Sequence, residues 1–213
     1  MFTAHTLVLR RLLPTNNMTT VYFVRHSKAD NSVRDDAMRP LTEQGMKTRW
    51  VIAEYLGDKG VNVVLASPYK RTIDTVAELA EKNGLIIEEI YDFRERKPDS
   101  KWLTDDEFFD FVGRQWADLD YKLSDGESLR EVQRRNIVAL NDVLKRYKGK
   151  TIAVGTHGTA LSTIINYYEP QYGHDDFWAM VKLTPWVVKM QFEGEEFKSI
   201  EKIDVLAMYN VSY

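Results

Sequence analysis

Residues 21–32 read VYFVRHSKADNS and join a strand pattern to an Arg-His pair. The four β-prone residues 21–24 predict a buried strand, and Arg25 and His26 follow it directly. One interpretation is a strand that ends by chance in two polar residues. The other is an imidazole that a rigid element holds beside a fixed positive charge. The remaining strand ends of the chain decide between these two interpretations.

Strand-like and helix-like segments alternate along the rest of the chain. Ser67 and Pro68 give one helix start, a hydroxyl N-cap followed by proline at the first helical position. The predicted helices cover residues 42–56, 68–83, 105–116, 127–148 and 160–168, and the further strands cover 61–67, 85–90, 151–156, 186–194 and 197–205. This alternation predicts an α/β fold, a mostly parallel central sheet with helices on both faces.

The composition excludes several classes of protein. The net charge of −3 argues against a whole-surface affinity for nucleic acid or for an anionic membrane. No apolar run reaches the roughly 18 residues needed to cross a bilayer. The absence of cysteine removes disulfides, thiolate nucleophiles and cysteine-ligated metals, and it fits a cytoplasmic protein. The oligomeric state cannot be read from the sequence.

The chain divides into a short extension and one domain. Residues 1–17, MFTAHTLVLRRLLPTNN, are expected to form a poorly ordered N-terminal extension, because Met18 directly precedes the first convincing strand. A processed targeting peptide is the alternative, although His5 and two arginines interrupt the apolar stretch of a secretory signal. Residues 18–213 are expected to form a single domain, since 213 residues fit one large α/β unit.

Polar residues collect at three predicted strand ends. The first strand ends in Arg25 and His26, and the strand over 151–156 ends in His157 and Gly158. A third strand leads into the helix that carries Arg71 in its first turn. Ligands of open parallel sheets bind beyond the carboxyl ends of the strands. Each residue alone is weak evidence, but their coincidence predicts one site.

Arginines and imidazoles together suit a phosphoryl group. A guanidinium offers two parallel donors to phosphate oxygens and stays charged, and a helix N-terminus adds backbone donors. A neutral imidazole can attack phosphorus to form a phosphohistidine that water then hydrolyses. The leaving alkoxide needs a proton, so a carboxylic acid is expected nearby.

Four motifs, in this order, resemble those of the histidine phosphatase superfamily, which includes cofactor-dependent phosphoglycerate mutase and many phosphatases: VRHS, SPYKRTIDT, FRER and THGT. RPLTEQG and DGESLREV resemble further signatures of the family, and the resemblance covers roughly residues 20–168. It implies a phosphoglycerate mutase-like fold. It also implies that His26 is the phosphorylated nucleophile, that Arg25, Arg71 and His157 hold the phosphoryl group, and that Glu95 is the proton donor.

Two departures from the family pattern concern the turn after His26. Ser27 stands where the family usually has glycine, and its hydroxyl is expected to donate to a phosphate oxygen. Asn31 lies one place before the position of a frequent asparagine, which is Ser32 here. Ser27, Asn31 and Gly158 are therefore expected as further substrate contacts. Glu127 and Ser128 match the family's GES motif, and either catalysis or helix capping explains them.

The sequence predicts a metal-independent phosphatase that hydrolyses a small phosphomonoester through phospho-His26 and needs no metal and no cofactor. A phosphoglycerate mutase with the same centre is the first alternative. The segment SVRDDAMRPLTEQG, residues 32–45, lacks the FTGW-like stretch of the mutases. A non-catalytic phosphate-binding protein is the second alternative. Substrate choice is expected to depend on residues 91–125.

Overall fold

A six-stranded mixed sheet forms the centre of the protein in the computed structural model, which describes residues 17–101 and 103–211. The strands run in the order β3-β2-β4-β1-β5-β6. Their bounds are β1 (Met18–Arg25), β2 (Val63–Ala66), β3 (Ile87–Glu89), β4 (Thr151–Thr156), β5 (Trp186–Glu193) and β6 (Glu196–Ile203). The pairs β3-β2, β2-β4 and β4-β1 are parallel, whereas β5 and β6 form an antiparallel hairpin that closes one edge. This confirms the predicted α/β fold.

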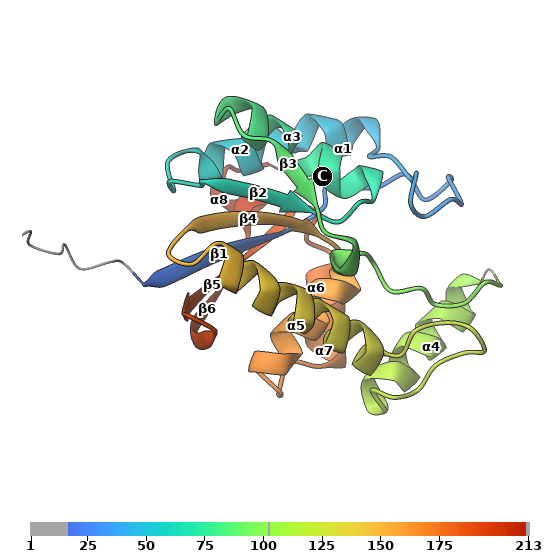
Figure 1. Ribbon diagram of the computed structural model, residues 1–213. Coiled ribbons are helices and arrows are strands. Elements are labelled where there is room, and N and C mark those ends of the chain that lie inside the picture. The colour runs from blue at the N-terminus through green and yellow to red at the C-terminus, as the bar shows by residue number, and fades with distance from the viewer. Residues whose placement is uncertain (1–16, 102, 212–213) are drawn as a thin grey trace, which may run out of the picture.

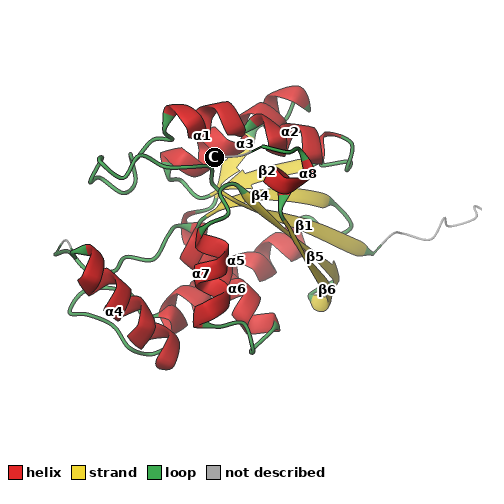
Figure 2. Ribbon diagram, turned by 180° about the vertical axis from the view of Figure 1, so that it is seen from behind, coloured by secondary structure: helices red, strands yellow, loops and turns green. Residues whose placement is uncertain are grey.

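Helices cover both faces of this sheet (Figure 1). One face carries α1 (Glu43–Thr48), α2 (Trp50–Gly57), α3 (Lys70–Lys82) and α8 (Val205–Met208), and the other carries α5 (Leu129–Arg146), α6 (Gly158–Tyr168) and α7 (His174–Val181). A short 3-10 helix, η1 (Tyr91–Phe93), follows β3. The remaining helix, α4 (Asp105–Ala117), stands at one side of the α5–α7 layer (Figure 2).

The strand β1 is buried on both faces, which explains its run of apolar residues. Val21 and Phe23 belong to the core beneath α5, α6 and α7, and Tyr22 and Val24 belong to the core beneath α2 and α3. A strand between two helix layers has no solvent face, so alternation of polar and apolar residues is not required. Residues 21–24 thus place β1 in the middle of the sheet.

A buried cation attaches α4 to the body of the protein. Arg96 is only 4% exposed, donates to the side-chain oxygen of Gln115, and lies 4.9 Å from the centre of the Phe111 ring. The Gln115 amide in turn donates to the carbonyls of Tyr121 and Glu127. Burial lowers the pKa of Arg96 to about 10, so the side chain stays charged at neutral pH. The predicted helix over 105–116 is confirmed.

Two helix predictions were wrong in detail. The segment 42–56 forms two helices, which separate at Arg49, where this side chain turns to donate to the carbonyl of Asp74 on α3. Ser67 does not cap α3, because its hydroxyl pairs with His157 and the N-cap position falls on Tyr69. The helices α7 and α8 were not predicted. The predicted extension lies, except for Asn17, outside the described residues. Among the described residues, no helix is long and apolar enough to span a membrane.

Candidate active site

Two histidine rings meet where the carboxyl ends of β1 and β4 lie side by side. The parallel register pairs Arg25 with Thr156, and the backbone N–H of His26 donates to the Thr156 carbonyl at 3.1 Å. The next residues, His26 and His157, therefore leave the sheet together. Their ring centroids are 5.4 Å apart, with the planes at 68°. The structure thus brings together the two histidines predicted from the strand ends.

The imidazole of His26 is held in one tautomer. Its Nδ1 lies 2.7 Å from the carbonyl oxygen of Ser27. A carbonyl can only accept, so Nδ1 carries the proton and Nε2 keeps its lone pair. Desolvation by burial, followed by the charges of Arg71 and Arg25, holds the pKa of His26 well below its usual value. The ring is therefore neutral at physiological pH, as a nucleophile must be.

The second histidine, His157, is completely buried at the N-cap position of α6. Its Nε2 lies 2.8 Å from the hydroxyl of Ser67, and the Tyr69 ring lies 5.1 Å from its ring. Burial is the main cause that lowers its pKa well below the usual value, and the charge of Arg71 is the next. In the tautomer where Ser67 donates to Nε2, Nδ1 carries the proton. No described residue bonds to Nδ1, so it can donate to a phosphoryl oxygen.

The first turn of α3 supplies Arg71, which is 2% exposed. Its guanidinium donates to the backbone carbonyl of Asp36 at 2.5 Å and lies 3.2 Å from the carboxylate of the same residue. It also lies over the Tyr69 ring, 5.1 Å from the ring centre. The effect of Arg71 on the pKa of both histidines locates it at the site. The loop over residues 30–40 is thus bound to Arg71 through Asp36.

Arg25 has a contact that the sequence did not predict. Its Nη1 donates to three carbonyls at the end of α7, those of Met180 at 2.7 Å, Val181 at 3.1 Å and Leu183 at 2.8 Å. Carbonyls at a helix C-terminus attract a cation. Arg25 therefore anchors α7 to the end of β1, besides placing its charge near His26. Its predicted role as a phosphoryl ligand stays a prediction.

The carboxylate of Glu95 is bound at the start of α6, in the same turn as His157. It accepts from the backbone N–H groups of Thr159 at 3.1 Å and Ala160 at 3.2 Å, and also from that of Arg96 at 2.7 Å. Its charge raises the pKa of Arg71, although burial makes the larger, opposing contribution. The one carboxylate that the FRER motif singled out therefore lies at the turn that carries His157.

The other predicted substrate contacts differ in their placement. Ser27 is completely buried; its backbone N–H donates to Thr75 Oγ1 at 3.0 Å, and its hydroxyl has no partner among the described residues. Gly158 begins α6 and lies under Arg25, where an added Cβ would be 3.3 Å from the Arg25 Nε. Asn31 lies in an exposed turn, and no hydrogen bond links its side chain to the described site residues. The structure brings Ser27 and Gly158 to the site but not Asn31.

Sequence reasoning missed a third arginine. Arg39 donates through Nε to the Val33 carbonyl at 2.9 Å and through Nη1 to the Asp36 carboxylate at 2.8 Å. Its charge lowers the pKa of His26 and of Arg71, which locates it near both. The signal was present in the RPLTEQG motif, which resembles a family signature but suggested no role for Arg39 by itself.

Comparisons with known proteins agree with this geometry. The family model described as "Histidine phosphatase superfamily (branch 1)" matches residues 21–204. The "Probable phosphoglycerate mutase GpmB" of Enterobacter sp. (strain 638) is 29% identical over 167 residues, which cover 70% of this chain and 74% of that protein.

Two solved structures share the fold. A phosphoglycerate mutase from Bacillus anthracis aligns with a TM-score of 0.71 at 18% identity and covers 92% of this chain and 97% of its own. The mycobacterial glucosyl-3-phosphoglycerate phosphatase in complex with inorganic phosphate aligns with a TM-score of 0.68 at 17% identity. The alignment covers 86% of this chain and 95% of the phosphatase chain.

Proposed function

Because this chain belongs to the histidine phosphatase superfamily (branch 1), we propose that it hydrolyses a small phosphomonoester through a phosphohistidine on Nε2 of His26. The contact between His26 Nδ1 and the Ser27 carbonyl carries the proposal. It leaves the lone pair on Nε2, and it stabilises the positive ring that forms when Nε2 is phosphorylated while Nδ1 keeps its proton. We propose that residues 18–213 act as one catalytic unit.

The first step begins with Glu95 protonated. Nε2 attacks phosphorus, the bond between phosphorus and the ester oxygen breaks, and the leaving alcohol takes the proton of the Glu95 carboxyl, which becomes a carboxylate. In the second step the Glu95 carboxylate takes a proton from water, the water oxygen attacks phosphorus, and the bond from phosphorus to Nε2 breaks. Inorganic phosphate leaves, and Glu95 and His26 return to their starting protonation states. Arg71, Arg25 and His157 stabilise the equatorial oxygens during both transfers.

A phosphoenzyme measurement tests this proposal. After rapid mixing with p-nitrophenyl phosphate and a denaturing quench at alkaline pH, mass spectrometry of the intact protein is expected to show the added mass of one phosphoryl group. His26→Ala is expected to lose both the adduct and the turnover, and His174→Ala, which changes a partly exposed histidine on α7, is expected to keep both. Turnover by His26→Ala at the wild-type rate would refute the mechanism. Activity is expected to survive EDTA, because the arginines supply the positive charge.

Phosphoglycerate mutase activity is the second candidate, and the name of the Enterobacter relative supports it. A mutase returns the phosphoryl group from the histidine to the substrate instead of to water. Hydrolysis is favoured here because the segment 32–45 lacks the FTGW-like stretch. The mutase would be favoured if, with bisphosphoglycerate added, the protein converted 3-phosphoglycerate to 2-phosphoglycerate faster than it hydrolysed either compound. Inactivity across a broad phosphoester panel would favour a binding protein.

A further inference from the structure

One arginine of α5 holds the loop that carries Glu95. The side chain of Arg135, only 11% exposed, donates through Nη1 to the carbonyls of Asp92 at 2.7 Å and Arg94 at 2.9 Å. Its Nη2 donates to the carbonyl of Glu95 itself at 3.2 Å. A guanidinium is a planar fork of fixed geometry, so these bonds determine the path of the backbone up to Glu95.

Glu127 holds both Arg135 and the far side of the same loop. Its carboxylate binds Arg135 in a bidentate pair, with distances of 2.8 Å to Nε and 3.0 Å to Nη2. The same carboxylate accepts from the backbone N–H of Lys97 at 3.0 Å, and the Glu127 N–H donates to the Lys97 carbonyl at 2.8 Å. Residues on both sides of Glu95 are therefore bonded to one ion pair.

The acid and the hydroxyl of the GES motif have different roles. The hydroxyl of Ser128 accepts from the Glu131 backbone N–H at 3.1 Å, and the Glu131 side chain accepts from the Ser128 N–H, which forms the capping box of α5. Glu127 takes no part in that cap. Its partners are Arg135, Lys97 and Arg94, all of them on or against the loop of Glu95.

We propose that Arg135, oriented by Glu127, is a positioning residue for Glu95. By holding the backbone of the Glu95 loop, Arg135 sets the distance from the Glu95 carboxyl to the leaving-group oxygen. This inference rests on the proposed role of Glu95 as proton donor. Neither Arg135 nor Glu127 forms a side-chain hydrogen bond with His26, Arg71 or His157; their bonds are with the loop of Glu95. After burial and the charge of Arg71, the charge of Arg135 also lowers the pKa of His157, so a small loss common to both kinds of substrate is expected when Arg135 is replaced. A misplaced Glu95 would therefore matter most for substrates whose leaving group needs a proton.

The experiment compares two substrates that differ in this need. p-Nitrophenyl phosphate has a leaving group that departs without a proton, whereas glycerol 2-phosphate, an alkyl ester, requires one. Arg135→Gln is expected to lower kcat/KM for glycerol 2-phosphate by about 10- to 100-fold and for p-nitrophenyl phosphate by less than about threefold. Arg134→Gln, which changes the exposed neighbour on the same helix, is expected to change neither.

Two additional variants make the outcome unambiguous. In a Glu95→Gln background, Arg135→Gln is expected to cause no further selective loss, because the residue it positions can no longer donate. If Arg135→Gln does not fold, Glu127→Gln, which keeps Arg135 and the three carbonyl bonds, is expected to show the same selectivity for the leaving group. An equal loss for both substrates, or no loss, in a folded variant overturns the positioning role. Failure of the wild-type protein to hydrolyse either substrate overturns the proposed function instead.

Discussion

The carboxylate of Asp36 lies 3.2 Å from Nη2 of Arg71, and the carbonyl of Asp36 accepts from Nη1 of the same guanidinium. Arg39 Nη1 donates to the same carboxylate oxygen, Oδ1, at 2.8 Å. An acid from the loop over residues 30–40 therefore lies between two arginines near His26. A phosphoryl group that binds Arg71 must compete with this acid for the same donors.

Removal of the Asp36 charge is expected to tighten phosphate binding. Asp36→Asn should lower the inhibition constant of inorganic phosphate by up to about fivefold, because a half-exposed ion pair contributes roughly 0.2–1 kcal/mol. The turnover number should change little, since Asp36 takes no part in either proposed step. Product inhibition by phosphate measures the effect. Asp58→Asn, at the opposite end of the sheet after α2, is the charge-matched control, and an unchanged inhibition constant in Asp36→Asn would contradict the competition.

Stability is expected to fall as the pH drops from about 6.5 to about 5. The pKa values of His26 and His157 are both depressed in the folded protein, first by burial and then by the charge of Arg71. In this window the unfolded chain binds more protons than the folded one, so the free energy of unfolding rises with pH, by up to about 1.4 kcal/mol per pH unit for each histidine. Urea unfolding at several pH values measures the slope.

The variant His157→Gln isolates one of these two contributions. It is expected to reduce the slope by about half, because only His26 then remains depressed. Depressed carboxylates such as that of Glu127 lose their contribution only at lower pH and leave this window unaffected. A slope as steep in His157→Gln as in the wild type would show that other groups take up the protons.

Gly126 is expected to tolerate no side chain. A Cβ added there would lie 1.9 Å from the carbonyl oxygen of Pro98 and 3.0 Å from that of Lys97. Gly126→Ala should destabilise the protein by about 1–3 kcal/mol, because both contacts are with backbone that Glu127 holds in place. Thermal unfolding measures this loss. The backbone of Lys97 and Pro98, which the added methyl group would displace, belongs to the loop of Glu95. A fall in kcat should therefore accompany the loss of stability.

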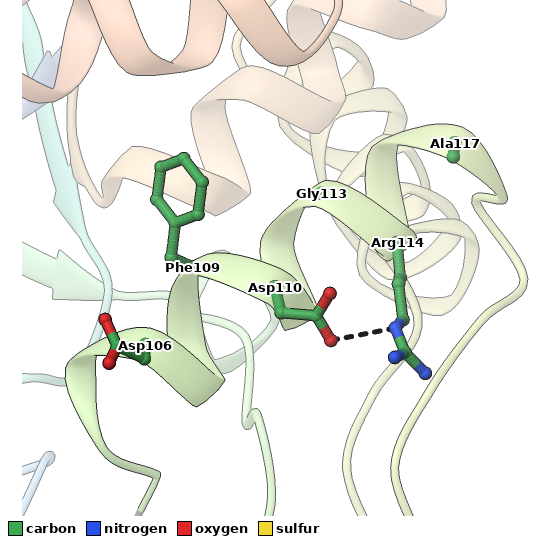
Figure 3. A pocket seen from close by; sticks show the side chains of 6 residues that line it. All are labelled: Asp106, Phe109, Asp110, Gly113, Arg114 and Ala117. Atoms are coloured by element: carbon green, nitrogen blue, oxygen red, sulfur yellow. Dashed lines mark ion pairs between the residues drawn. The ribbon is translucent and has the colours of Figure 1, made fainter.

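Gly113→Ala is the matched control for Gly126→Ala in thermal unfolding, because a side chain at Gly113 meets no neighbour. Gly113 lies inside α4, where an added Cβ meets nothing within 4 Å. It lines a hollow along this helix together with Phe109 and the ion pair between Asp110 and Arg114 (Figure 3). Gly113→Ala is expected to stabilise the protein by about 1 kcal/mol and to leave activity unchanged. Equal effects of the two substitutions would contradict the backbone clash at Gly126.

Ser27→Ala is expected to weaken substrate binding and to stabilise the ligand-free protein. The Ser27 hydroxyl is buried without a partner among the described residues, and an unsatisfied buried hydroxyl costs about 1–3 kcal/mol. Its removal should raise the free energy of unfolding of the ligand-free protein. If the hydroxyl donates to the phosphoryl group, as predicted from the sequence, KM should rise severalfold in the same variant. A stabilised variant with unchanged KM would remove Ser27 from the substrate contacts.

The sequence predicted those parts of the site that the sheet alone determines. Parallel strands end at one edge, so the approach of His26 to His157 followed from two strand patterns far apart in the chain. The same argument brought Arg71 to this edge, since β2 leads directly into α3. Glu95 needed the FRER motif, because its own segment holds several acids and no periodic pattern separates them.

The remaining contacts depend on elements that the sequence did not disclose. The partners of Arg25 are carbonyls at the end of α7, a short helix that was not predicted, and no pattern in β1 indicates them. Ser67 reads as a helix cap by every local rule, yet its hydroxyl pairs with His157 from another strand. Long-range pairing of this kind overrides local preference and requires the three-dimensional arrangement.

The position of β1 in the sheet also determines when the protein can fold during synthesis. Val21 pairs with Ile152 on one side and with Met190 on the other, so the first described strand in chain order has the fourth and the fifth as its neighbours. Until β4 and β5 leave the ribosome, an apolar strand with two open edges stays exposed. The central part of the sheet is therefore completed only after β4 and β5 have been made. A nascent chain that stalls before β5 presents this strand to chaperones and to other nascent chains.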